Sequence, residues 1–326
     1  MVAPMEPLQE PEASAPTLDA PPGPTAITAL AFFGLALVAF LVAGSLAQLS
    51  NVPFGLLWTE VFIFFIPVWL IVRGKRVQVW DWLELARPRP RWLALGLLCG
   101  LANYPIAGAL EAVVRAQVAA RWPAFAKKSD IAAATLGAVH GWQVAVLVIA
   151  VGVAAPLCEE TAFRGLIQHG LGRALRPAQA IALTAFLFAF IHLEPIGGLA
   201  RMELGVLFGV LVLWTRSVWT SIAAHMANNL FATGLFLATR GQGAPSGAPG
   251  GLQLLELFAL GAVLLLPLLL WASAHRVEPG GRAPEAAAPA RGELAGWIAI
   301  ALGTLGILLA VGVTTGALHR AVQMAR

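Results

Sequence analysis

The sequence predicts an all-α membrane protein, a polytopic transmembrane bundle of about eight or nine helices built around a four-helix core. Of the 326 residues, 59% are hydrophobic and 12% are charged, and the mean hydropathy is +0.78. A soluble domain carries roughly 25% charged residues, so this balance excludes an ordinary soluble enzyme. Helices are the expected spanning elements because lipid offers no hydrogen-bond partners to an open backbone, and no segment alternates like a barrel strand.

The N-terminal part of the chain predicts a tail followed by three membrane spans. Residues 1–25 are rich in Pro and Ala and contain four acidic residues but no Lys or Arg, which is typical of a disordered acidic tail. A spanning helix needs about 20 mostly apolar residues. Residues 26–128 hold three such stretches, followed by a mixed Arg, Trp and Lys segment that we interpret as interfacial. The three stretches are 26–49, 54–72 and 92–114, and the interfacial segment is 118–128.

Four further spans fall within residues 136–237, and we expect them to form the core of the bundle. The first of them contains Pro156, which is expected to kink it. The Gly- and Pro-rich residues 238–251 predict a flexible loop, and residues 252–326 predict C-terminal spans joined by a Pro/Ala/Gly linker at 278–292. The core spans are 144–169 (beginning at 136 at the earliest), 178–192, 204–214 and 218–237, and the C-terminal spans are 252–274 and 294–318.

Basic residues are concentrated in short loops between the spans. The loop 73–91 contains six Lys and Arg residues, so the positive-inside rule places it, and with it the N-terminus, in the cytoplasm. We therefore expect an integral protein of a bacterial inner membrane. The net charge of +4 and the pI near 9.7 do not indicate nucleic-acid binding, because the charges are not gathered on one surface. The expected partner is the lipid bilayer, and no nucleic-acid partner is expected.

Ionisable residues within the apolar spans are the strongest functional signal, since each costs about 3 kcal/mol or more unless it is paired or hydrated. Glu160 and Arg164 lie four residues apart, share one helical face and can pair. Glu159 is rotated by about 100° from Glu160, so it is free to face a cavity. A desolvated carboxylate beside a like charge suits general-base work on water. The structural alternative is an ion pair that only stabilises the helix end.

Two further polar clusters follow in the next spans. Phe188 and His192 share a helical face, and Glu194 and Pro195 are expected to end that helix. His225 and Asn229 also share a face at a four-residue spacing, and both can reach a bound water, a metal or an oxyanion. Taken singly, His192 can be a structural residue that only forms a hydrogen bond. His225 and Asn229 can likewise form a polar contact between helices. Together, the three clusters indicate a shared polar centre.

In order along the chain, the clusters read EETAFRG at residues 159–165, FAFIH at 188–192 and HMANN at 225–229. This ordered set resembles the CPBP family of intramembrane proteases, which includes the CAAX prenyl endopeptidases and the bacterial Abi, bacteriocin-processing relatives. The pattern of that family is EExxxR, FxxxH and HxxxN. The resemblance covers roughly residues 144–237 and implies that residues 136–237 form a CPBP-like catalytic core.

The resemblance also implies a role for each motif residue. Glu159 matches the glutamate that activates water, and Glu160 with Arg164 matches its supporting pair. Asn229 matches the amide that helps to stabilise the oxyanion. The implied enzyme is a CAAX-type intramembrane endopeptidase, either a metalloprotease or a glutamate peptidase.

Two histidines, His192 and His225, match the essential histidines of the family. Together with Glu159 they supply a ligand set for Zn²⁺ or another divalent metal, with an open position for water. Equally, Glu159 and His192 can activate water without a metal. The zincin signature HExxH is absent from the sequence, and both alternatives stay open.

The expected substrate is a membrane-associated peptide or a lipidated protein, including a prenylated CAAX-type protein. A proton-coupled transporter is an alternative, because intramembrane Glu, His and Arg also build proton relays. A non-catalytic membrane scaffold or immunity protein is another, and it predicts that Glu159→Gln leaves function intact.

Overall fold

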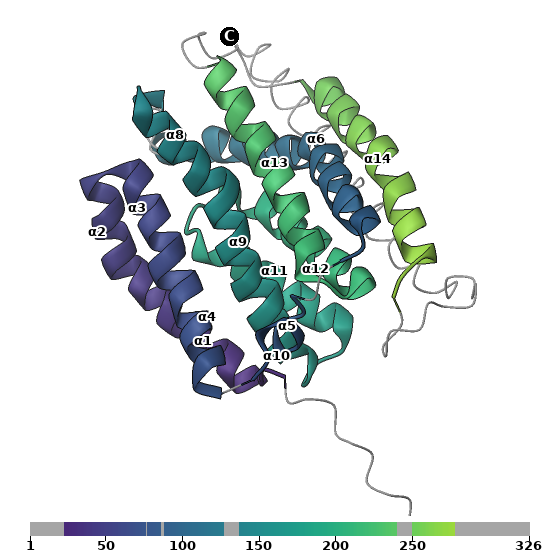
Figure 1. Cartoon of the computed structure of the whole chain (residues 1–326). Coiled ribbons are helices and arrows are strands. Elements are labelled where there is room, and N and C mark those ends of the chain that lie inside the picture. Colours follow the sequence, from purple (N-terminus) through teal and green to yellow (C-terminus); the bar gives the residue numbers. More distant parts are fainter. Residues whose placement is uncertain (1–22, 76, 86–87, 127–136, 240–249, 278–326) are drawn as a thin grey trace, which may run out of the picture.

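The computed structural model describes residues 23–75, 77–85, 88–126, 137–239 and 250–277, and this part of the chain is an all-α bundle (Figure 1). All eight spans predicted within the described residues are helical. The predicted ninth span, its preceding linker and most of the N-terminal tail lie outside those residues. Six helical stretches of the described chain are long and apolar enough to cross a membrane, which confirms the predicted fold class. They are Ala26–Ser50, Val52–Lys75, Pro90–Arg121, Trp142–Gly172, Gly198–Thr215 and Gly251–Ala274.

The first two spans form a tight helical hairpin at one side of the bundle (Figure 1). Asn51 ends the first span, and its side chain accepts a hydrogen bond from the backbone N–H of Phe54 at 3.2 Å, which caps the second. Close packing at this turn needs Gly55, because a Cβ there would meet the backbone of Ala47 at 2.5 Å. The hairpin comprises α1 (Ala26–Ala39), η1 (Phe40–Gly44), α2 (Ser45–Ser50), α3 (Val52–Thr59), η2 (Glu60–Phe65) and α4 (Ile66–Lys75), in which η marks a π-helical segment.

After the short α5 (Val79–Trp82), α6 (Pro90–Arg121) runs as one helix of 32 residues. The expectation of a separate interfacial segment from residue 118 is therefore wrong in its first residues. Residues 115–121 are good helix formers, and the helix stops only where Trp122 precedes Pro123, as the steric restriction before proline requires. Gly100 brings α6 against α13 (Val218–Thr239), because a Cβ there would clash with the carbonyl oxygen of Ala224.

The fourth span is a single helical stretch with two π-helical segments within it. Pro156 is the second residue of α9, just after the first π-helical segment, and the wider turn accommodates its missing N–H. The kink expected at Pro156 stays a prediction. The span comprises α8 (Trp142–Ile149), η3 (Ala150–Ala154), α9 (Ala155–Glu160), η4 (Thr161–Gln168) and α10 (His169–Gly172).

Helix α11 (Pro177–Ile191) ends before Glu194 and Pro195, as expected. Helix α12 (Gly198–Thr215) is longer than the predicted 204–214. Its first turns carry Arg201 and Glu203, which lie ahead of the predicted span. Both are partnered: Arg201 bonds to Glu194 at 2.8 Å, and Glu203 accepts from Asn103 of α6 at 2.8 Å. A partnered polar residue does not need to lie outside the helix.

The ends of several helices, two of them followed by an arginine, meet at one end of the bundle (Figure 1). Arg173 after α10 donates to the backbone oxygen of Gly23 ahead of α1, at 3.1 Å. Arg216 after α12 pairs with Glu84 after α5, at 2.7 Å. Val277, which follows α14 (Gly251–Ala274), donates to a carbonyl at the end of α12. This arrangement agrees with loops on one membrane side, and the cytoplasmic assignment of that side stays a prediction.

Candidate active site

The two adjacent glutamates lie at the end of α9, between the π-helical segments η3 and η4. Glu159 is 6% exposed and Glu160 is fully buried. A π turn rotates the residues that follow it relative to a regular α-helix, and such turns occur often at functional sites. The segmented span therefore sets the directions in which the two neighbouring carboxyls point.

Glu160 forms the predicted ion pair with Arg164. The Nη1 atom of Arg164 donates to Oε1 of Glu160 at 2.7 Å, and neither side chain is accessible. Nη2 of Arg164 donates to the carbonyl of Gly205 in α12 at 3.0 Å. The guanidinium carbon lies 4.6 Å from the ring centre of Phe188 and 5.3 Å from that of Phe208. Besides Glu160, two rings and a carbonyl thus hold the cation in place.

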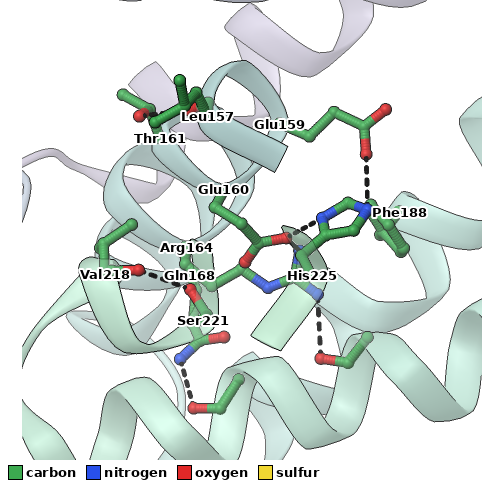
Figure 2. A network of polar contacts seen from close by, with 12 residues as sticks. Leu157, Glu159, Glu160, Thr161, Arg164, Gln168, Phe188, Val218, Ser221 and His225 are labelled. Atoms are coloured by element: carbon green, nitrogen blue, oxygen red, sulfur yellow. Dashed lines mark hydrogen bonds and ion pairs between the residues drawn. The ribbon is translucent and has the colours of Figure 1, made fainter. Parts of the chain in front are cut away.

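His225 of α13 lies between the two glutamates (Figure 2). Its Nδ1 is 3.0 Å from Oε1 of Glu160, and its Nε2 is 4.0 Å from Oε2 of Glu159. The Phe208 ring stacks on the imidazole with centroids 5.0 Å apart. The Glu160 carboxylate, which pairs with a guanidinium, can only accept hydrogen bonds, so Nδ1 carries the proton. In the neutral ring, Nε2 is then an acceptor that faces Glu159.

His192 caps the end of α11 and approaches Glu159 from the other side. Its Nδ1 lies 2.7 Å from the carbonyl oxygen of Phe188, and its Nε2 lies 4.0 Å from Oε1 of Glu159. A carbonyl oxygen only accepts, so Nδ1 of His192 also carries the proton. Both imidazoles therefore direct an Nε2 lone pair at the same carboxylate.

Glu159 makes no hydrogen bond with any residue that the structure describes, and its Oε2 is buried without a partner. A buried polar group without a partner is costly. With the two imidazole nitrogens, Glu159 forms a set of three acceptors that face one another. Such a set is completed by a molecule that has protons to give, such as water, or by a cation.

Asn229, one turn after His225 in α13, has a hydrogen-bond partner outside this set. Its Nδ2 donates to the carbonyl oxygen of Val151 in η3 at 2.9 Å. An amide nitrogen has two hydrogens, so one N–H remains for another acceptor. The structure thus brings together Glu159, Glu160, Arg164, His192 and His225, and it shows Asn229 tying α13 to the π-helical segment ahead of α9.

Sequence reasoning missed a third buried acid. Glu60 begins η2, is 6% exposed, and its Oε2 has no hydrogen-bond partner among the described residues. Segment η2 packs against α9. The signal was present, since a single acidic residue within an apolar span is itself a functional-site hypothesis. The ring contacts of Phe208 and the acceptor at Gly205 had no comparable signal, because they depend on how α12 packs.

The chemistry of Glu159, His192 and His225 suits zinc, but their spacing does not. Ligands at the usual distances around a tetrahedral zinc ion lie about 3.3 Å apart, whereas the two nitrogen-to-oxygen separations here are 4.0 Å. Within the described part of the chain, no group of three or more His, Cys, Asp or Glu side chains is arranged to hold a metal. We derive no step through a metal, and metal dependence stays a prediction.

The six long apolar helical stretches of the described chain define an integral membrane protein, and its bundle holds a buried centre of acids and imidazoles. The family model for type II CAAX prenyl endopeptidases, Rce1-like, matches residues 140–231, a range that contains all six predicted site residues. The match supports, over this region, the resemblance to CPBP-family intramembrane proteases drawn from the three motifs. Searches of curated proteins and of solved structures found no match.

Proposed function

We propose that the protein is an intramembrane endopeptidase in which Glu159 activates a water molecule. The observation that carries this proposal is the different surroundings of two adjacent carboxyls. Glu160 is neutralised by Arg164 and bonded to His225, whereas Glu159 has no hydrogen-bond partner and faces two imidazole nitrogens. A base must keep its lone pair available for the proton that it removes.

In the proposed reaction, a water molecule binds between Glu159, His192 and His225. Glu159 takes one proton as the water oxygen bonds to the carbonyl carbon of the peptide. The carbon–nitrogen bond then breaks, and the leaving amine takes the proton from Glu159. His192 orients the water through its Nε2 lone pair, because its Nδ1 proton is held by the Phe188 carbonyl.

His225 has a second proposed task, the stabilisation of the oxyanion. Glu160 accepts its Nδ1 proton and so favours the positively charged ring once Nε2 is protonated, as a carboxylate does for the histidine of a catalytic triad. In the tetrahedral intermediate, Nε2 of His225 takes over the proton that Glu159 removed from the water, across the 4.0 Å that separates it from Oε2 of Glu159, and so donates to the oxyanion. The same proton then returns to Glu159 and passes to the leaving amine. The remaining N–H of Asn229 is the second proposed donor, and one such donor contributes about 3–4 kcal/mol to the transition state.

The proposed substrates are membrane-associated chains, in particular prenylated CAAX-type proteins, whose lipid enters the site from the bilayer. The family match supports this class. The proposed location is a bacterial inner membrane with the basic end of the bundle in the cytoplasm, in accordance with the positive-inside rule. The six apolar helical stretches of the described chain support the membrane part of this proposal.

The test compares purified wild type with Glu159→Gln in lipid vesicles. The substrates are a prenylated CAAX peptide and a panel of unmodified membrane-segment peptides, each with and without a chelator. Glu256→Gln is the matched control, because Glu256 is an exposed glutamate of the membrane helix α14. We expect cleavage by wild type and by the control, and none by Glu159→Gln.

Equal cleavage by wild type and Glu159→Gln would refute the mechanism. If neither protein cleaves any peptide, the transporter or scaffold alternative gains. Loss of activity with the chelator, restored by a divalent metal, would show that a metal takes part.

A further inference from the structure

Arg201 is a cation that the proposed reaction does not use. It lies at the end of the loop that joins His192 to α12. It lies in the first turn of α12, and its Nη1 donates to Oε2 of Glu194 at 2.8 Å. Its side chain is 31% exposed and that of Glu194 is 34% exposed. The pair closes the loop that joins His192 to α12.

Only one edge of the Arg201 guanidinium is occupied. Its Nη1 bonds to Glu194, while Nε and Nη2 have no hydrogen-bond partner in the described part of the chain. The Nε and Nη2 hydrogens of an arginine form a planar fork that matches both oxygens of one carboxylate. Arg201 therefore has a free edge of the right shape for a second anion.

Glu194 does not compete for that edge, because other donors already hold its oxygens. Its Oε1 accepts from the backbone N–H of Ile196 at 2.9 Å, and its Oε2 accepts from that of Gly197 at 2.7 Å. Burial would raise the pKa of Glu194, but the hydrogen bonds from Arg201 and the backbone outweigh it and hold the pKa below its usual value. The carboxylate is ionised, and its charge is shared among three donors.

The guanidinium is fixed in place close to the reaction centre. It lies over Gly197, where a Cβ would clash with Nη1 of Arg201. Its positive charge acts on both Glu159 and His192. Only eight residues separate Arg201 from His192 in the sequence, and the Arg201–Glu194 pair closes the loop between them, so the cation lies close to the end of the helix that carries His192.

We propose that Arg201 binds the C-terminal carboxylate of the substrate. This inference rests on the proposed function. A CAAX-type chain ends three residues after its prenylated cysteine, so a free carboxylate lies at most about 10 Å beyond the scissile bond when those residues are extended. A fixed cation at the edge of the site recognises that end and sets the position of the bond to be cut.

The test uses two prenylated peptides that differ only in ending as a free carboxylate or as a carboxamide. We expect wild type to cleave the carboxylate peptide about ten- to a hundred-fold more efficiently, mostly through KM, as for a hydrogen bond to a charged group. Arg201→Gln is expected to abolish the preference for the carboxylate peptide, and so to lower its cleavage by a much larger factor than that of the carboxamide peptide.

Glu194→Gln is the matched control, because it weakens the same contact but keeps the cation, and we expect it to retain the preference for the carboxylate. Equal losses on both peptides in Arg201→Gln, or no preference in wild type, would overturn the proposal and leave Arg201 a structural residue. Binding of both peptides to Glu159→Gln, with and without Arg201→Gln, decides the matter even if the proposed hydrolysis is not found. Tighter binding of the carboxylate peptide only when Arg201 is present supports the inference.

Discussion

Removal of Arg164 is expected to destabilise the protein far more than removal of Arg164 and the charge of Glu160 together. In Arg164→Met, the Glu160 carboxylate stays fully buried with only His225 beside it, and the carbonyl of Gly205 loses its donor. Loss of one partner of a buried ion pair costs about 3–5 kcal/mol, or roughly 6–20 °C in the unfolding midpoint. The double variant Glu160→Gln/Arg164→Met buries no unpaired charge, and its amide oxygen still accepts from His225.

We expect the double variant to lie within about 1–2 kcal/mol of wild type, since buried ion pairs are often replaceable by neutral groups. The assay is thermal unfolding in detergent micelles, followed by tryptophan fluorescence for wild type, both single variants and the double variant. The losses of stability in the two single variants should add up to more than the loss in the double variant. The difference, which is the coupling energy of the pair, should be about 2 kcal/mol or more. Additive losses, or a small loss in Arg164→Met, would refute the account of this pair.

Two further predictions concern packing and pH. Gly100→Ala places a methyl group against the carbonyl oxygen of Ala224 and is expected to lower stability by about 1–3 kcal/mol, whereas Gly108→Ala on the same helix meets open space and should raise it by up to about 1 kcal/mol. Equal midpoints for the two variants in micelles would contradict the helix contact. Because the hydrogen bonds from Arg201 and the backbone hold the pKa of Glu194 below its usual value of about 4.5, its contribution to loop stability is complete above about pH 4.5 and is lost as the pH falls below that value. Hydrogen exchange at Ile196 should show this loss in wild type and not in Glu194→Gln.

The fold class followed from composition because the bilayer permits few spanning architectures. The helix ends followed less well. The length of α6 depends on where a proline first forbids a further turn, and it was misjudged because Arg121 was interpreted as part of an interfacial segment that begins at residue 118. The start of α12 depends on tertiary partners for Arg201 and Glu203, which no local pattern reveals.

The site divides in the same way. The pairing of Glu160 with Arg164 followed from a four-residue spacing, which fixes two side chains on one face. The distance from Glu159 to either imidazole depends on how three separate spans pack, so sequence could suggest their meeting but not its geometry. The bond from Asn229 to Val151 is a contact of the same tertiary kind. Glu60 could have been predicted as a site residue, because it is a single acidic residue within an apolar span.

The central claim is that two adjacent carboxyls have different tasks, and a side-by-side comparison of Glu159→Gln and Glu160→Gln tests it most directly. For each variant, kcat/KM on a prenylated CAAX peptide and the unfolding midpoint are measured in the same micelles. Glu159→Gln is expected to keep or raise the midpoint, because the buried Oε2 of Glu159 has no hydrogen-bond partner among the described residues, and to lose about 10²–10⁴-fold in activity. Glu160→Gln is expected to lower the midpoint, because it leaves Arg164 buried without its charged partner. Wild-type activity in Glu159→Gln, or equal loss of stability in both variants, would contradict the account.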